Sequence, residues 1–260
     1  MPLPQADPRI LQWDACLNVR DLGGLPTSDG GTTRWGALVR ADSLCRLTNA
    51  GCRALVAHGV RTVVDLRFPE EVAKANHPFR DERFASGVRY RNVPINTGRD
   101  PALDADLFAA FAAAPSLVEI YRLDLDANPK GLARIAAAIA QAPEGGVAVH
   151  CELGKDRTGV VVALLLALVG VPEEVIADDY ALSMQGLQPG FARWLAEEAP
   201  QEPRERARLS RRGRAEAATM WQTLAYLAER YGGSERYLLA GGLPPSDVAT
   251  LRRRLVETGI

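Results

Sequence analysis

The chain has 260 residues, 47% of them hydrophobic, which is enough for a sizeable core. Its net charge of −1 indicates no nucleic-acid partner, and its apolar runs are too short for stable insertion into a membrane. Four cysteines without zinc-type spacing predict reduced thiols in a cytoplasmic protein. We recognise no signal peptide, although export without a readable signal stays open, and no feature indicates an oligomeric state.

The first 35 residues are rich in Gly and Pro and predict an irregular segment. A short strand is expected at 37–40. Thr48 can cap a helix that runs to about residue 58, where Gly59 stops it. The β-branched run at 60–67 ends in charged residues, which predicts a buried strand with polar groups at its carboxyl end.

The middle of the chain alternates between strand and helix patterns. Residues 88–95 alternate in polarity and predict a strand, and a polar loop follows at 96–106. Two helices are expected within 107–142, separated near Asn128 and Pro129. A short buried strand at 147–150 precedes an apolar helix that Gly170 ends.

Residues 173–258 are expected to be largely helical. Breaks are predicted at Pro189-Gly190, Pro200–Pro203, Gly232-Gly233 and Gly241–Pro245. The pattern predicts an α/β fold with a central sheet flanked by helices and a largely helical C-terminal part. We expect a single domain over 1–260, with an irregular segment to about 35, an α/β core over 36–171 and a helical supplement over 172–260.

The stretch HCELGKDRTG, from His150 to Gly159, lies between the strand at 147–150 and the apolar helix. Ligands of open α/β sheets bind beyond the carboxyl ends of the strands. A helix N-terminus there offers unpaired N–H groups and the positive end of a dipole, which suits phosphate. A cysteine in that field, here Cys151, ionises more readily than a free cysteine.

The other residues of the stretch fit attack of sulfur on a phosphate ester. Arg157 can hold two phosphate oxygens in a bidentate fork. Gly154 lets the backbone approach closely, and Gly159 is expected to ease packing of the helix against the sheet. The hydroxyl of Thr158 could donate a hydrogen bond to the sulfur of Cys151 and help the thiolate leave.

HCELGKDRTG resembles the H-C-x-x-G-x-x-R-[ST]-G signature of cysteine-dependent protein tyrosine phosphatases, in the G-K-D-R-T-G form of an atypical bacterial subgroup. That subgroup includes triple-specificity phosphatases that act on phosphotyrosine, phosphoserine/threonine and phosphoinositides. Outer blocks are similar to the family more weakly: NVRDLGG from Asn18, RADSL from Arg40, DLR from Asp65 with Glu71, and YGG from Tyr231 followed by YL at Tyr237 and by Gly241.

The resemblance implies a cysteine-phosphatase-like fold and a phosphocysteine intermediate, with no metal and no cofactor. Cys151 is the implied nucleophile and Arg157 the phosphate clamp. The implied phosphate-binding cradle consists of Glu152, Leu153, Gly154, Lys155, Asp156 and Arg157. Phosphorylated proteins or phosphoinositides are the implied substrates.

Two residues of the stretch have a second interpretation. His150 is either a hydrogen-bonded core residue or, by the logic of the family, an orienting neighbour of the thiolate and not a general base. Lys155 is either a surface charge or a second cation that favours highly charged headgroups, and we favour the second.

The leaving oxygen needs a proton, which a carboxylic acid usually supplies. Triple-specificity relatives resemble this chain but carry an aspartate directly after the strand that corresponds to 88–95, where this chain has Asn96 and Thr97. Asp156 is the preferred candidate, against the alternative that it only caps the helix. Asp100 is the second candidate, against an ordinary turn residue.

Charged residues outside the stretch support it or face solvent. Five of them are expected to form one buried network that holds the loop: Arg20, Asp21, Arg40, Asp65 and Arg67. The basic run at 204–214 is interpreted as a solvated surface, or alternatively as a rim that attracts a polyanion. Residues 96–125 and 185–215 could form a lid over the loop.

Two other functions compete with a phosphatase. One is a catalytically weak module that only binds phosphate, which the presence of every group needed for turnover disfavours. The other is a rhodanese-like sulfurtransferase, which also has a cysteine in a strand–helix loop. The five residues between Cys151 and Arg157 and the RTG ending disfavour it.

Overall fold

The strands at the centre of the molecule form a five-stranded sheet. The computed structural model describes residues 7–80, 87–96, 109–197, 202 and 213–257. The sheet has the order β1-β3-β6-β4-β5, with β1 antiparallel to β3 and the other neighbours parallel. Its strands are β1 (Arg20–Asp21), β3 (Leu38–Ala41), β6 (Gly146–His150), β4 (Val60–Asp65) and β5 (Arg89–Asn92).

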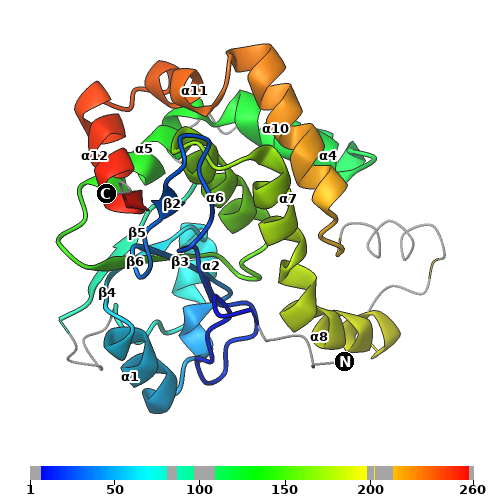
Figure 1. The fold of residues 1–260 in the computed structure, drawn as a ribbon. Helices are drawn as coiled ribbons and strands as arrows, with labels where there is room; N and C mark the ends of the chain where they lie inside the picture. Colours follow the sequence, from blue (N-terminus) through cyan, green and yellow to red (C-terminus); the bar gives the residue numbers. More distant parts are fainter. Residues whose placement is uncertain (1–6, 81–86, 97–108, 198–201, 203–212, 258–260) are drawn as a thin grey trace, which may run out of the picture.

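Helices cover both faces of this sheet. The helices of the chain include α1 (Asn49–Ala57), α2 (Pro69–Ala73), α4 (Leu117–Ala127), α5 (Pro129–Ala140), α6 (Asp156–Leu168), α7 (Glu173–Ala181), α8 (Ser183–Glu197), α10 (Ala217–Tyr231), α11 (Ser234–Ala240) and α12 (Pro245–Leu255). Figure 1 shows α1 on one side of the sheet and α5 and α6 on the other, with α10, α11 and α12 outside them. The expected α/β class, with a helical C-terminal part, is confirmed.

Alternating strand residues build two apolar layers, because successive side chains of a strand point to opposite faces. Val39 and Val63 pack with residues of α1, such as Leu55. Leu38 and Val64 join the larger cluster with α5 and α6. Helix α6 is buried along nearly all of its length, which explains its uninterrupted apolar sequence.

Most predicted elements form where the sequence places them. The side chain of Thr48 accepts a hydrogen bond from the N–H of Gly51 and so caps α1. Gly59 has a φ of 93°, which only glycine adopts without strain, and it ends this helix as expected. The breaks at 232–233 and 241–245 separate α10, α11 and α12.

Four expectations about secondary structure need correction. Residues 1–35 are not wholly irregular, since β1 and β2 (Thr32–Thr33) form there, and β2 pairs with β7 (Val256–Glu257), where helix was expected. Helix α8 continues through Pro189-Gly190, although an interior proline removes one hydrogen bond of the helix and crowds the carbonyl four residues before it. The strand expected at 88–95 is shorter, with β5 at 89–92.

The predicted break at 200–203 falls almost wholly outside the described residues. Within the part of the chain that the structure describes, no helix combines the length and the apolar character needed to cross a membrane.

Candidate active site

The HCELGKDRTG stretch lies at the carboxyl edge of the sheet. Strand β6 ends at His150, the loop occupies 151–155, and α6 begins at Asp156. Neighbouring parallel strands end in the same layer, because Ala41 of β3 and Asp65 of β4 both pair with His150. The structure therefore places the motif where open α/β sheets bind their ligands.

Hydrogen bonds from outside the loop hold three consecutive loop carbonyls. The N–H of Ser43 donates to Glu152 at 2.9 Å, Nδ2 of Asn18 to Leu153 at 2.9 Å and Nη2 of Arg40 to Gly154 at 2.8 Å. In a trans peptide the C=O of one residue and the N–H of the next point in opposite directions. The N–H groups of 153–155 therefore point away from these anchors, which leaves them for a ligand.

Gly154 lies where the loop touches the sheet most closely. Its φ is 64°, and a Cβ atom there would lie 2.3 Å from the carbonyl oxygen of Ala41. The position therefore requires glycine for both conformation and space.

The N-terminus of α6 has no side-chain cap. Lys155 occupies the N-cap position and makes no capping hydrogen bond. Asp156 was open to interpretation as a cap, but its Oδ1 instead accepts from Lys155 Nζ at 2.6 Å and from the hydroxyl of Tyr121 at 2.6 Å. The first N–H groups of the helix are thus not satisfied by capping, which favours an anion at this point.

Lys155 is 1% exposed, so the interpretation as a surface charge is wrong. Its ammonium group lies within the loop region and pairs with Asp156. Gly159 also differs from expectation, because it faces α7 and not the sheet. A Cβ at Gly159 would lie 3.0 Å from the ring of Tyr180.

Arg157 is held by α2. Its Nη1 and Nη2 donate to the two carboxylate oxygens of Glu71 at 2.5 and 2.9 Å, and its Cζ lies 5.0 Å from the ring centre of Phe68. Burial would lower the pKa of the guanidinium, but Glu71 and the nearby Cys151 raise it above its ordinary value. Arg157 is therefore a fixed cation next to the thiol.

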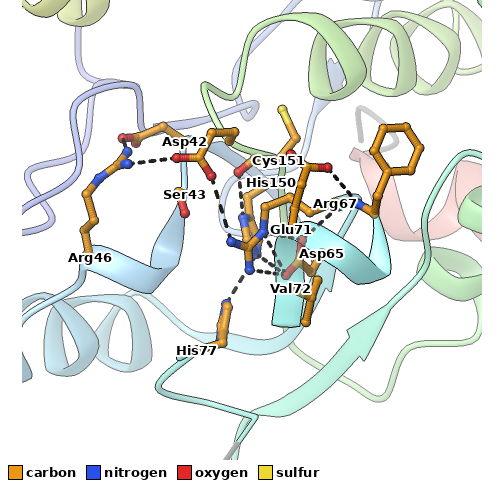
Figure 2. Close-up of polar contacts among 12 residues, drawn as sticks. Asp42, Ser43, Arg46, Asp65, Arg67, Glu71, Val72, His77, His150 and Cys151 are labelled. Carbon is orange, nitrogen blue, oxygen red and sulfur yellow. Dashed lines mark hydrogen bonds and ion pairs between the residues drawn. The ribbon is translucent and has the colours of Figure 1, made fainter. Parts of the chain in front are cut away.

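Cys151 is 3% exposed at the start of the loop. Figure 2 shows its sulfur pointing away from the imidazoles of His150 and His77. The expected hydrogen bond from Thr158 to the sulfur is not formed. The Thr158 hydroxyl is buried without a hydrogen-bond partner among the described residues.

Two histidines form a hydrogen-bonded chain beneath the loop (Figure 2). The N–H of Phe79 donates to Nδ1 of His77, so the Nε2–H of His77 can donate to Nε2 of His150 at 3.3 Å. Nδ1 of His150 then donates to the carbonyl of Cys151 at 3.0 Å. Burial lowers the pKa of His150 and that of His77, the latter to about 3. His150 is thus a neutral support of the backbone at Cys151.

Asp65, His77 and His150 also bring three potential metal-ligating atoms within 4.8 Å of one another. However, the Asp65 carboxylate accepts from Nη2 of Arg67 at 2.7 Å and from the hydroxyl of Tyr90 at 2.8 Å. A guanidinium already neutralises this carboxylate, and a metal ion would have to compete with it. The group is better explained as a hydrogen-bonded support.

The five charged residues expected in one network are all buried, but they form three separate groups. Arg20 and Arg40 both pair with Asp179 of α7, at 2.9 and 2.7 Å. Asp65 pairs with Arg67, and Asp21 contacts His58 and the N–H of Gly36. The first group contacts the loop through the bond from Arg40 to Gly154, and the second through an ion pair of 3.9 Å between Nη1 of Arg67 and the carboxylate of Glu152.

Some predicted features lie outside the described residues. Asp100 is one of them, as is most of the basic run at 204–214. The proposed lid over 96–125 and 185–215 is described only in part. These remain predictions from the sequence.

A comparison with models of known protein families shows to which family the chain belongs. A model of the tyrosine phosphatase family matches residues 11–257, which is nearly the whole chain. The chain belongs to this family.

Individual members of the tyrosine phosphatase family are similar over most of the chain. A tyrosine-protein phosphatase of Nostoc commune is 34% identical over 86% of this chain and 75% of its own length. A putative tyrosine-protein phosphatase of Cupriavidus necator is 32% identical over 67% of the chain and 63% of its own length. The triple specificity protein phosphatase of Mycobacterium tuberculosis is 29% identical over 67% of the chain and 69% of its own length.

This phosphatase is therefore a cysteine-based phosphoric monoester hydrolase. The phosphate-binding module and the rhodanese-like sulfurtransferase are not favoured. The presence of all loop residues of the signature agrees with the family assignment.

Sequence reasoning missed three residues of this phosphatase that contact the loop machinery. Glu71 was noted only as part of a motif, although it holds Arg157. Tyr121 and Asp179 lie in helices with no local signal of a functional role. A buried carboxylate at Asp179 could have been expected, because the buried Arg20 and Arg40 need a counter-charge.

Proposed function

We propose that this phosphatase hydrolyses phosphate monoesters through a phosphocysteine at Cys151. In the first step a sulfur–phosphorus bond forms as the bond from phosphorus to the leaving oxygen breaks, and an acid gives that oxygen its proton. In the second step water attacks phosphorus, the sulfur–phosphorus bond breaks and phosphate leaves. Arg157 and the loop N–H groups stabilise the phosphoryl oxygens in both steps.

One observation carries this proposal. The carbonyls of residues 152–154 are held from outside the loop, and α6 starts without a side-chain cap. The N–H groups of the loop and of the first helical turn are thus oriented or available for an anion, with Cys151 at the start of the loop and Arg157 at its end.

The direct test replaces the nucleophile. Cys151→Ser is expected to lower hydrolysis of p-nitrophenyl phosphate by at least about a thousandfold, because a hydroxyl is a far weaker nucleophile. Cys52→Ala, in α1 away from the loop, is the control and should retain activity. Near-wild-type turnover by Cys151→Ser would rule the proposal out.

We infer that Asp156 is the general acid. Its side chain is 39% exposed and lies in the first turn of α6, next to Arg157. Asp156→Asn should lower kcat/KM about a hundredfold for an alkyl phosphate, but less than about tenfold for p-nitrophenyl phosphate, whose leaving group needs no proton. Equal losses for both esters would contradict the acid role. Asp100→Asn, measured in parallel, tests the other candidate.

Two side chains support a substrate with an apolar or a highly charged part beside the phosphate. Leu153 is 44% exposed in the middle of the loop, where it can contact an aromatic ring. Lys155, two residues before Arg157 in the loop, adds a second cation that pairs with Asp156. We infer that phosphotyrosine and phosphoinositides are both candidate substrates, and the mycobacterial relative is named a triple specificity protein phosphatase. Ranking phosphopeptides and phosphoinositide vesicles by kcat/KM tests this inference.

A further inference from the structure

Hydrogen bonds hold the carboxylate of Asp156 at one oxygen only. Oδ1 accepts from the hydroxyl of Tyr121 and from Nζ of Lys155, both at 2.6 Å. Oδ2 has no hydrogen-bond partner among the residues that the structure describes. An oxygen that already accepts two short hydrogen bonds is a poor site for a proton. A proton that Asp156 gives to a leaving group therefore belongs on Oδ2.

Tyr121 reaches Asp156 from a separate element. It lies in the middle of α4 and is fully buried, whereas the Asp156 side chain is partly exposed. Its hydroxyl also lies 2.7 Å from that of Tyr180 in α7, and the two rings pack edge to face. Since the proton of Tyr121 points to Asp156, Tyr180 must donate to Tyr121. A chain of two phenols thus ends on the carboxylate.

Both phenols keep their protons, so Tyr180 can donate to Tyr121 and Tyr121 to Asp156. Burial raises the pKa of Tyr121 and of Tyr180 above the ordinary tyrosine value, and the charge of Asp156 raises it further. They therefore stay protonated at any pH where a phosphatase works. Phenylalanine would fill the same space in the core, so what the hydroxyls add is a fixed direction toward Asp156.

Gly159 of the RTG ending belongs to this arrangement. A Cβ at this position would press on the ring of Tyr180 at 3.0 Å. The glycine therefore lets α7 bring Tyr180 close to the start of α6, and through Tyr180 it places Tyr121. A glycine of the sequence motif thus affects the position of Tyr121 in α4, which lies 35 residues before Asp156 in the sequence.

We propose that Tyr121 is a positioning residue for the general acid: it fixes the Asp156 carboxyl group through Oδ1, so that Oδ2 faces the leaving oxygen of the substrate. This proposal rests on the acid role that we propose for Asp156. Tyr121 itself transfers no proton to the substrate. Without this hydrogen bond, Oδ1 keeps only the flexible Lys155 side chain as a donor, so the carboxyl group rotates more freely and spends less time in the productive orientation.

The test replaces the hydroxyl and nothing else. Tyr121→Phe should lower kcat/KM about tenfold or more for an alkyl phosphate and less than about threefold for p-nitrophenyl phosphate. Tyr237→Phe is the matched control, because its buried hydroxyl donates to the carbonyl of Leu125, also in α4, and has no bond to Asp156. The control should change neither ester by more than about twofold. Equal losses for both esters in Tyr121→Phe would overturn the proposal.

A double variant separates this proposal from the acid role on which it rests. If Tyr121 acts through Asp156, the Tyr121→Phe/Asp156→Asn enzyme should be no slower with the alkyl phosphate than Asp156→Asn alone. Multiplied losses would contradict positioning through Asp156. If Asp156→Asn slows both esters equally, the acid role fails. If it slows only the alkyl ester while Tyr121→Phe behaves like Tyr237→Phe, the positioning role fails and the acid role stands.

A second variant guards against loss of folding. Tyr180→Phe leaves the bond from Tyr121 to Asp156 in place and removes only the outer donor. It should lower kcat/KM less than Tyr121→Phe does. As in Tyr121→Phe, the loss should be larger for the alkyl phosphate than for p-nitrophenyl phosphate. A larger loss of kcat/KM than in Tyr121→Phe would contradict the proposed order of hydrogen bonds, from Tyr180 to Tyr121 to Asp156.

Discussion

Gly154 shows how a single residue shapes the phosphate-binding loop. Its positive φ turns the backbone so that its carbonyl meets Arg40 and the preceding carbonyls meet Asn18 and Ser43. The N–H groups on the other side of the same peptides are thereby turned toward the ligand. The residue thus acts through the backbone, and any side chain there would disturb three amide directions at once.

Gly154→Ala is expected to destabilise the protein by about 2–4 kcal/mol, from a strained φ and a contact of 2.3 Å with Ala41, and to lower activity about tenfold or more. Gly30→Ala is the matched control, with a φ of 86° but no atom within 4 Å of the added Cβ. Urea unfolding and kcat/KM for p-nitrophenyl phosphate check both variants. Equal losses of stability and activity in the two variants would contradict the role of the close contact between Gly154 and Ala41, because the two glycines share only a positive φ.

Helix α7 connects the strands to the loop through one carboxylate. Asp179 accepts from Arg20 of β1 and Arg40 of β3, and Arg40 continues to the carbonyl of Gly154. Although burial would raise the pKa of Asp179, the two arginines lower it to about 2. The carboxylate is thus ionised at neutral pH, and its removal would leave two buried cations without their partner.

Asp179→Asn should therefore lower the free energy of unfolding by about 3–5 kcal/mol, and it should reduce activity even where the protein is still folded, because Arg40 loses its anchor. Asp178→Asn, the exposed neighbour on the same helix, should change neither. Unfolding curves and kcat/KM at a temperature well below the transition measure both effects. A stable, fully active Asp179→Asn protein would contradict this role.

The elements that the sequence predicts well are those with local signals. A cap at Thr48, a stop at Gly59 and glycines at 232–233 mark helix ends, and β-branched runs mark β4 and β6. Strands β1, β2 and β7 have two residues each and exist only because distant segments pair with them. Such pairing leaves no local pattern, so these strands could not be predicted.

The candidate site also contains residues that the sequence predicts and residues that it does not. The residues of the loop itself were predicted, because the chemistry fixes their type and spacing. Their supports come from remote helices: Glu71 from α2, Tyr121 from α4 and Asp179 from α7. Each is visible only when the chain is folded, and the predicted single network of Arg20, Asp21, Arg40, Asp65 and Arg67 divides into three groups for this reason.

At the scale of the whole molecule, buried neutral imidazoles make stability depend on pH. His77 has a pKa of about 3 in the folded state against about 6.5 for an exposed histidine, mainly because it is buried. Its neighbours are His150, Asp65, Arg67 and Arg80. Between pH 3 and 6.5 the unfolded chain binds more protons than the folded protein, so stability falls as pH falls through this range.

The free energy of unfolding should thus decrease by about 2 kcal/mol from pH 7 to pH 5, at about 1.4 kcal/mol per pH unit below 6.5. His77→Asn should reduce this slope, because it removes the buried imidazole. Urea unfolding at both pH values measures the slope. An identical pH dependence in wild type and His77→Asn would contradict the assignment.

The central claim is that Cys151 carries the phosphoryl group during turnover. The most direct measurement mixes the enzyme with p-nitrophenyl phosphate, quenches in acid within the first turnover and maps the peptides by mass spectrometry. We predict one phosphoryl group on the peptide that contains Cys151 and none in Cys151→Ser. Turnover by the wild-type enzyme without a phosphorylated peptide, or with phosphate on another residue, would contradict the account.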